Sequence, residues 1–212
     1  MKLILSEEQQ FLKDTAKSFA RDKTPTTHFR KLRDDENTKC WDDSIWQEMV
    51  QLGWSGILVP EEFGGSDFGI AGISVIMQEL GKTLTPSPIL ATSVLGVSTI
   101  NLLGSKEQKE KYLPKIVSGD VTTALAIDEG NHHSPLDVEA TAILKGDKWS
   151  LNGQKVFIID GASADYILIV ARTSGKKGDS NGLSVFVSEK NSEGLEISKI
   201  STADCRNYSN LK

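Results

Sequence analysis

The densest group of chemically versatile side chains in the sequence is Asp128, Glu129, His132, His133 and Asp137. Imidazole and carboxylate groups bind metals, but adjacent histidines rarely converge on one ion, and no second histidine cluster supports them. Asp128 and Glu129 are neighbours at the end of an expected strand, so their side chains point to opposite faces. We therefore predict no metal site and no general acid–base pair here, but a solvated strand end.

Other familiar catalytic and nucleotide-binding motifs are missing from the sequence. No G-x-G-x-x-G follows an expected strand, no G-x-x-x-x-G-K-[ST] occurs, and there is no Gly-x-Ser-x-Gly elbow. Phosphate loops of the two common kinds and an α/β-hydrolase nucleophile are therefore not predicted. Trp46, Trp54 and Trp149 are expected to be packing residues and not ligand platforms.

Composition narrows the class of protein further. The 212 residues carry a net charge of -5 with mixed signs, and nucleic acid as the main partner would need clustered Lys and Arg. No apolar run approaches the length of a membrane span. Cys40 and Cys205 lie far apart and have no ligand spacing, which favours a reduced, cytoplasmic protein.

Residues 121–172 alternate short apolar runs with turn signals, a pattern typical of strands joined by tight turns. Asn152-Gly153, with an apolar run on each side, predicts a hairpin because both residues tolerate positive φ. Asp160-Gly161 predicts another turn. Residues 183–189 alternate apolar and polar side chains and predict a further strand.

The first 120 residues have helical spacing instead. Ser6 with Gln9, and Ser105 with Gln108, predict capping boxes at the start of two helices. Residues 26–40 are polar and fit either a loop or an exposed helix. Residues 89–103 are apolar almost all round, which predicts a buried helix. About five helices followed by strands make the fold class α+β.

Several motifs in order resemble the acyl-CoA dehydrogenase family over essentially the whole chain. LGWSGILVPEEFGG at 52–65, QELGKTLTPSPI at 78–89 and LLGSKEQKEKYLPKIVSGD at 102–120 are similar to family helices and the loop between them. LNGQKVFIIDGASAD at 151–165 resembles the family's mid-domain hairpin. Because the motifs share their order and spacing with the family, the chain is identified as a member of it.

The resemblance implies an all-α N-terminal helical bundle domain at 1–120 and a small β-barrel-like middle domain at 121–212. The family's C-terminal four-helix domain is expected to be absent. The implied reaction, part of fatty acid metabolism, is FAD-dependent α,β-dehydrogenation of an acyl-CoA thioester. A carboxylate base removes the α proton while a hydride passes to the flavin N5 atom. The family's base comes from the third domain, so no catalytic residue is assigned and this chain alone is expected to be inactive.

The family's flavin- and thioester-binding segment, Y-x-x-T-E-P-x-A-G-S-D, aligns without gaps with residues 125–135. The resemblance assigns Leu125, Ile127, Asp128 and Ser134 to the cofactor, and Ser134 to the acyl-CoA as well. Glu129 and Ser134 match the family pattern. Asp128 stands where the family has the Thr that donates to the flavin pyrimidine edge, and Pro135 replaces the last Asp.

The family's W-I-T motif becomes Phe157-Ile158-Ile159, which the resemblance also assigns to FAD. Phe157 can stack on the flavin ring system. Ile159 has no hydroxyl group for the flavin N5 atom. The departures at Asp128 and Ile159 fit either a drifted subfamily, in which backbone N–H groups hold the flavin, or a subunit that binds FAD weakly.

Three functions therefore stay open. The first is the dehydrogenase itself, with acyl-CoA as substrate, a homo-oligomeric or hetero-oligomeric assembly, and electron-transferring flavoprotein as acceptor. The second is a non-catalytic or FAD-poor partner subunit of a hetero-oligomeric acyl-CoA dehydrogenase, which the two departures favour. The third and weaker one is a flavin oxidase or monooxygenase on the same fold.

Overall fold

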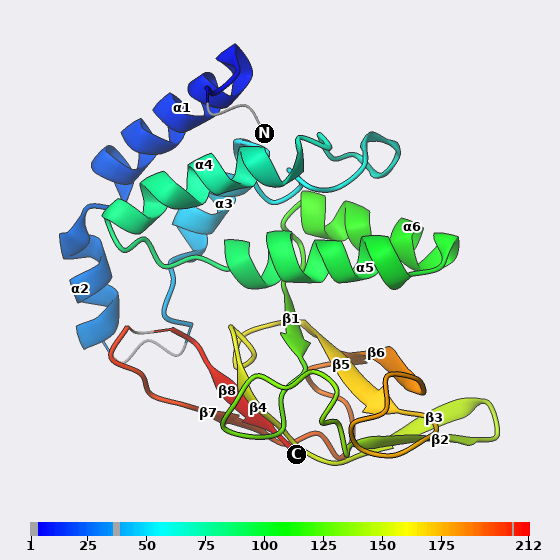
Figure 1. The fold of residues 1–212 in the computed structure, drawn as a ribbon. Helices are drawn as coiled ribbons and strands as arrows, with labels where there is room; N and C mark the ends of the chain where they lie inside the picture. The colour runs from blue at the N-terminus through cyan, green and yellow to red at the C-terminus, as the bar shows by residue number, and fades with distance from the viewer. Residues whose placement is uncertain (1–3, 36–38, 205) are drawn as a thin grey trace. The chain divides into compact units, whose positions relative to one another are not determined.

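A computed structural model describes residues 4–35, 39–204 and 206–212, so that Cys205 lies outside the described residues. The chain divides into two compact units, Met1–Asp120 and Val121–Lys212. The first unit contains the helices and the second contains the strands (Figure 1). Helices followed by β structure confirm the predicted fold class.

The helical unit begins its first and last helices as the sequence predicts. The Ser6 side chain accepts from the Gln9 amide at 3.2 Å, and Ser105 accepts from the Gln108 amide at 3.3 Å. In each case the glutamine side chain accepts in return from the cap residue's amide, which completes a capping box. The elements are α1 (Glu7–Lys23), α2 (Thr26–Asp34), α3 (Asp43–Gln51), the 3₁₀ turn η1 (Glu61–Phe63), α4 (Gly69–Lys82), the π-helix η2 (Ile89–Gly96), α5 (Val97–Leu103) and α6 (Lys106–Val117).

In this unit the structure decides one alternative that the sequence left open and corrects one prediction. Thr26–Asp34 is a helix, anchored by the buried Leu32, where the sequence left loop and helix open. The apolar segment after Pro88 is a π-helix that continues as α5. The prediction that residues 89–103 form a buried helix is wrong at the end of α5, where Leu102 is 80% exposed and Leu103 is 67% exposed. A π-turn holds more residues than an α-turn, so the side chains that share a face change along the segment.

Aromatic and aliphatic side chains form the core of the helical unit. Trp46 and Trp54 are both buried, as predicted for packing residues. The Phe19 ring of α1 meets the Trp54 ring edge-on at 5.1 Å, and Met49 and Ile76 are fully enclosed. Such aromatic pairs add to the burial of apolar surface that stabilises the unit.

The β unit contains two sheets. In the five-stranded sheet β5 is central: β1 pairs with it in parallel, β6 pairs with it antiparallel, and β2 joins it at Arg172 and carries β3. The three-stranded sheet has the order β4-β8-β7. The strands are β1 (Thr123–Ala126), β2 (Thr141–Lys145), β3 (Lys148–Asn152), β4 (Lys155–Ile158), β5 (Tyr166–Arg172), β6 (Leu183–Glu189), β7 (Ile197–Lys199) and β8 (Ser209–Leu211).

The predicted hairpin at Asn152-Gly153 is wrong. The hairpin turn lies instead between Lys145 and Lys148, which are paired in register. The chain leaves the first sheet at Gly153 and enters the second, where β4 pairs with β8. Gly153 has φ of 147°, and a Cβ built on it would lie 2.6 Å from the Ala140 Cβ. Glycine is needed here for a close backbone approach and not for a two-residue turn.

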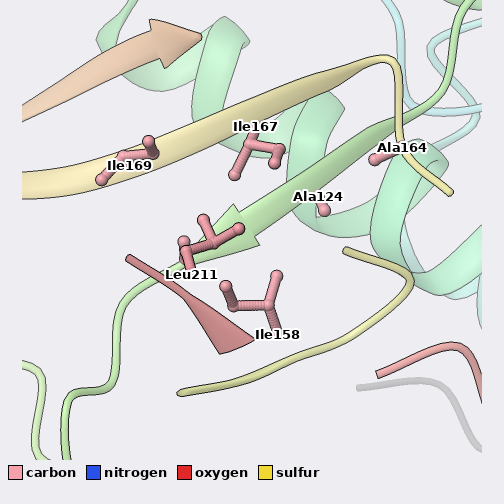
Figure 2. Close-up of a cluster of buried hydrophobic side chains, with 7 residues drawn as sticks. Ala124, Ile158, Ala164, Ile167, Ile169 and Leu211 are labelled. Carbon is pink, nitrogen blue, oxygen red and sulfur yellow. The ribbon is translucent and has the colours of Figure 1, made fainter. Parts of the chain in front are cut away.

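One of two buried clusters in the β unit lies between its two sheets (Figure 2), and the other contains Val138, Ala140, Ala142 and Ala171. Ala124 and Ile167 from the first sheet pack with Ile158 and Leu211 from the second. The described strands form a mixed five-stranded sheet and an antiparallel three-stranded sheet, and not a closed barrel. The β unit therefore has a packed interior, as a barrel does, but its strands do not pair in a closed ring as the predicted barrel-like domain would suggest. Trp149 is 47% exposed and rests on Phe186, with ring centroids 5.3 Å apart.

Candidate functional site

The segment that follows β1 runs beside β4, and this brings together two of the groups of residues that the sequence singles out. The Val156 amide donates to the Asp128 carbonyl at 2.8 Å, and Lys155 Nζ donates to the Ile127 carbonyl at 2.8 Å. Ile127 and Asp128 thus lie next to β4, the strand that contains Phe157. Leu125 lies within β1, half-buried and in register with Leu168, and its side chain is on the face opposite to Ala124.

Phe157 has an unusual backbone conformation that turns its ring outward. Its φ is 54°, and the pairing of β4 with β8 shifts register between Lys155 and Ile158, as at a β-bulge. The side chain is 59% exposed, and its ring meets the Tyr208 ring edge-on at 5.8 Å. Positive φ is strained for a bulky residue, and such strain is concentrated at functional sites. The bulge therefore presents a large aromatic face at the surface.

The next two residues have different environments. Ile158 is 2% exposed and its side chain points into the core between the sheets (Figure 2), so it can offer a ligand only its backbone. Ile159 is half-buried at the turn that follows β4. Its aliphatic side chain cannot form a hydrogen bond. Of the three motif residues, Phe157 alone has a well-exposed side chain.

Asp128 fixes the loop that contains Ser134. Its Oδ1 atom accepts from the Ser134 amide at 3.1 Å, and its Oδ2 atom lies 3.0 Å from His133 Nδ1. The Asp128 side chain is 25% exposed and that of His133 is 69% exposed. The carboxylate is therefore directed back into its own loop, and Ser134 is held next to it.

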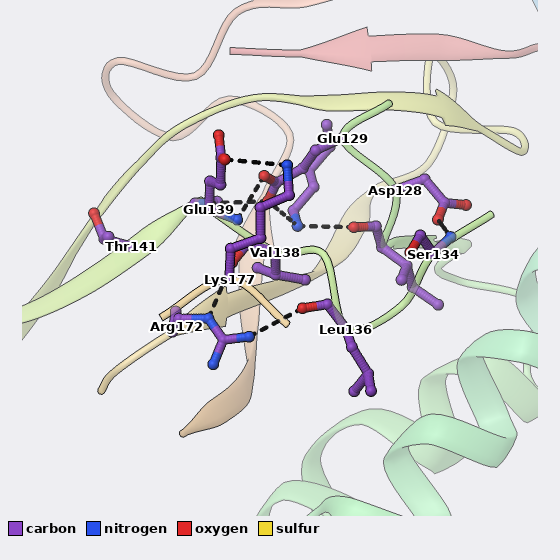
Figure 3. A network of polar contacts seen from close by, with 12 residues as sticks. Asp128, Glu129, Ser134, Leu136, Val138, Glu139, Thr141, Arg172 and Lys177 are labelled. Atoms are coloured by element: carbon purple, nitrogen blue, oxygen red, sulfur yellow. Dashed lines mark hydrogen bonds and ion pairs between the residues drawn. The ribbon is translucent and has the colours of Figure 1, made fainter. Parts of the chain in front are cut away.

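The expected solvated strand end is wrong for Glu129, which belongs to a buried ion pair. Glu129 Oε1 lies 2.7 Å from Lys155 Nζ, and these side chains are 10% and 2% exposed. Glu129 is labelled within the polar network of Figure 3. The Glu129 carboxylate also accepts from the amides of Glu139 at 2.7 Å and Ala140 at 3.0 Å. Burial lowers the pKa of Lys155, although Glu129 opposes that shift. The pair ties the loop after β1 to β4 and to the start of β2.

Asp160 is a buried carboxyl group that the sequence indicated only as a turn residue. It is 4% exposed and has φ of 57°. Burial raises the pKa of Asp160 to about 7, although Arg206 acts in the opposite direction. In the described residues its Oδ2 atom has no hydrogen-bond partner. A deeply buried carboxyl group thus directly follows Ile159.

A cavity of about 460 Å³ adjoins the loop after β1 that contains Ser134. Its walls include Glu129, Ser134, Gly153 and Lys177, but not Phe157 or Ile159. In the described part of the chain no three His, Cys, Asp or Glu residues are grouped as metal ligands. None of the described helices combines the length and the apolar character that a membrane crossing needs.

Comparison with known proteins gives matches over nearly the whole chain. Residues 6–120 match the family described as acyl-CoA dehydrogenase, N-terminal domain, and residues 124–209 match acyl-CoA dehydrogenase, middle domain. The chain is 33% identical over 204 residues to acryloyl-CoA reductase (NADH) of Anaerotignum propionicum, covering 94% of this chain and 50% of that protein. It is 31% identical over 207 residues to mitochondrial isovaleryl-CoA dehydrogenase of Pongo abelii, covering 92% and 47%.

A solved structure has the same fold. The acyl-CoA dehydrogenase from Geobacillus kaustophilus superposes with a TM-score of 0.85 at 27% identity, covering 100% of this chain and 56% of that one. The chain therefore spans about half the length of the curated relatives it matches, 50% and 47% of the two named above.

Proposed function

The chain belongs to the acyl-CoA dehydrogenase family, and we propose that it forms the flavin- and thioester-binding part of an enzyme that dehydrogenates an acyl-CoA. In this proposal residues 1–120 and 121–212 are the family's first two domains. The observation that carries it is the exposed Phe157 ring, held on a strained bulge beside the Asp128–Ser134 loop. The activity belongs to the whole protein or complex in which these residues take part.

The residues around Phe157 fit the ring system of FAD. An exposed aromatic face backed by Tyr208 suits stacking on a flat heterocycle, and the half-buried Ile159 adds apolar surface beside it. Side chains offer few hydrogen bonds to the polar edge of the flavin. The Asp128 carboxylate is directed to the Ser134 amide, and Ile159 has no hydroxyl group. In this proposal backbone N–H groups of 127–128 and 158–159 contact that edge.

Within this proposal each residue has a positional role. Bound FAD would accept the hydride from the acyl-CoA β carbon. Phe157 stacks on the flavin, Ile158 contributes only its backbone, and Ser134 contacts both cofactor and thioester. Asp128 sets the position of Ser134, and the Glu129–Lys155 pair anchors the segment that contains them. None of these residues is assigned the removal of the α proton.

The proposed partners are acyl-CoA, further copies of this chain or a related subunit, and electron-transferring flavoprotein as the electron acceptor. Leu102 and Leu103, the exposed apolar residues that end α5, support an oligomer, because adjoining exposed leucines favour association.

Anaerobic reduction of the flavin tests this function. The full-length protein or its complex is loaded with FAD and mixed with acyl-CoA thioesters of increasing chain length. We expect one of them to bleach the oxidised flavin absorption. A protein that binds FAD and acyl-CoA yet shows no bleaching with any thioester would refute the dehydrogenase.

A second candidate, an FAD-poor partner subunit, is favoured by one observation. Ile159 presents only aliphatic surface where the family places a hydroxyl group for the flavin N5 atom. Flavin content separates the candidates: a complex purified with its partner would contain one FAD per pair of subunits if this chain is the FAD-poor one. One FAD per subunit would favour the dehydrogenase instead.

A further inference from the structure

Arg172, at the end of β5, is a buried cation whose side chain donates, within the described part of the chain, to backbone carbonyls. The residue is 5% exposed. Its Nε atom donates to Val138 O at 3.0 Å, and Nη2 donates to Leu136 O and Asp179 O, both at 3.1 Å. Nη1 donates to Asn181 O at 3.0 Å. Among the described residues no carboxylate forms an ion pair with it, so four carbonyl dipoles replace its hydration.

These carbonyls come from two loops that are distant in sequence. Leu136 and Val138 belong to the Ser134 loop (residues 128–140), and Asp179 and Asn181 belong to the polar loop between β5 and β6 (residues 173–182, called here the 173–182 loop). Figure 3 shows the guanidinium beside Leu136 and Val138. A single planar group with several fixed donors thus joins the two loops, which an ammonium group could not do with the same reach.

The connection extends to Ser134. The Asp137 amide donates to Ser134 O at 2.9 Å, so Ser134 and Leu136 belong to one tight turn. Leu136 O also accepts from the Gly178 amide of the 173–182 loop at 3.0 Å. The position of the Ser134 turn therefore depends on contacts with the 173–182 loop, and most of those contacts involve one side chain.

We propose that Arg172 is a positioning residue that couples the Ser134 turn to the 173–182 loop, so that the two form one ordered edge of the acyl-CoA site. The role at the acyl-CoA site rests on the proposed function, whereas the coupling of the two loops does not. Arg172 would touch neither substrate nor cofactor. It would act through Ser134.

Amide hydrogen exchange tests the coupling. Arg172→Lys keeps the charge but cannot span both loops, and Arg172→Met removes the charge. Hydrogen bonds to a charged group contribute about 1.5–3 kcal/mol, so losing one should speed local exchange by roughly ten- to hundredfold. We expect this for the amides of Ser134, Asp137 and Gly178 together in both variants, with amides of the β5–β6 ladder unchanged.

The chain offers a matched control in Lys177→Gln. Lys177 also links the two loops, through an ion pair of 3.1 Å with Glu139, but these side chains are 51% and 67% exposed. Exposed pairs contribute little, so exchange should stay at the wild-type rate. Circular dichroism checks folding, and Arg172→Lys alone carries the test if the Met variant does not fold. Wild-type protection at Ser134 and Asp137 in Arg172→Lys would overturn the coupling.

Affinity for acyl-CoA tests the positioning role. The dissociation constant should rise about tenfold in Arg172→Lys, with FAD still bound and its spectrum unchanged. Faster exchange in both loops with wild-type acyl-CoA affinity would mean that Arg172 is structural only, and would overturn the role. If the wild-type protein binds neither FAD nor acyl-CoA, the proposed function fails, while the exchange experiment still decides whether Arg172 couples the loops.

Discussion

Removing one member of the Glu129–Lys155 pair should destabilise the protein more than any single surface change. The two charged atoms lie 2.7 Å apart, and Lys155 is 2% exposed. In Lys155→Met the Glu129 carboxylate stays buried, and its two backbone donors, the amides of Glu139 and Ala140, remain. Leaving a buried charge without its partner typically reduces the free energy of unfolding by about 3–5 kcal/mol. We expect a loss of about 3 kcal/mol, because the two amides still stabilise the carboxylate.

A double-mutant cycle separates the ion pair from the packing of each chain. Glu129→Gln combined with Lys155→Met removes both charges, so the double variant should lose clearly less stability than the sum of the single variants. Urea unfolding followed by circular dichroism measures each free energy of unfolding. Lys177→Met is the matched control, since its ion pair with Glu139 is exposed and should have no resolvable effect. Equal losses for Lys155→Met and Lys177→Met would refute the assignment of a buried, stabilising pair.

Asp160, Ile159 and the leucines at the end of α5 each give a further prediction. The raised pKa of Asp160, about 7 against an ordinary 3.8, means that the folded state holds this proton more tightly, so the associated stability is present below about pH 4 and is lost as pH rises through 7. Asp160→Asn should therefore match the wild type at pH 4 and be more stable at pH 8 by up to about 4 kcal/mol, and a pH-independent difference in urea titrations would contradict this. Ile159→Thr should tighten FAD binding several-fold by adding a hydroxyl worth roughly 1 kcal/mol, whereas Ile159→Val, which changes shape alone, should not. Leu102→Ser with Leu103→Ser should lower self-association in sedimentation velocity, and an unchanged distribution of species would show that this end of α5 is not in an interface.

Local signals predicted local structure well. The capping boxes at Ser6 and Ser105 form because each needs only a hydroxyl and a glutamine three residues later. The helix-then-strand order follows from periodicity in the same way. The hairpin predicted at Asn152-Gly153 does not form because β4 pairs with β8, which is distant in the sequence. No local pattern reveals that pairing.

The site was only partly visible in the sequence. Family motifs pointed to Asp128, Ser134 and Phe157, but neither the direction of the Asp128 carboxylate nor the bulge at Phe157 could be derived from residue types. Glu129 and Lys155 are 26 residues apart, so their pairing needs the β1–β4 contact to be known. Arg172 ends an ordinary apolar strand, and its four carbonyl partners appear only after the loops are folded.

A titration with FAD tests whether the exposed Phe157 ring stacks on a flavin. Trp149→Ala is the matched control, because Trp149 is also an exposed aromatic residue of the β unit, 47% exposed against 59% for Phe157. Flavin fluorescence should be quenched saturably by the wild-type protein and by Trp149→Ala, and Phe157→Ala should weaken binding at least tenfold. Equal affinities in the three proteins, or no saturable binding in any of them, would show that Phe157 does not stack on a flavin.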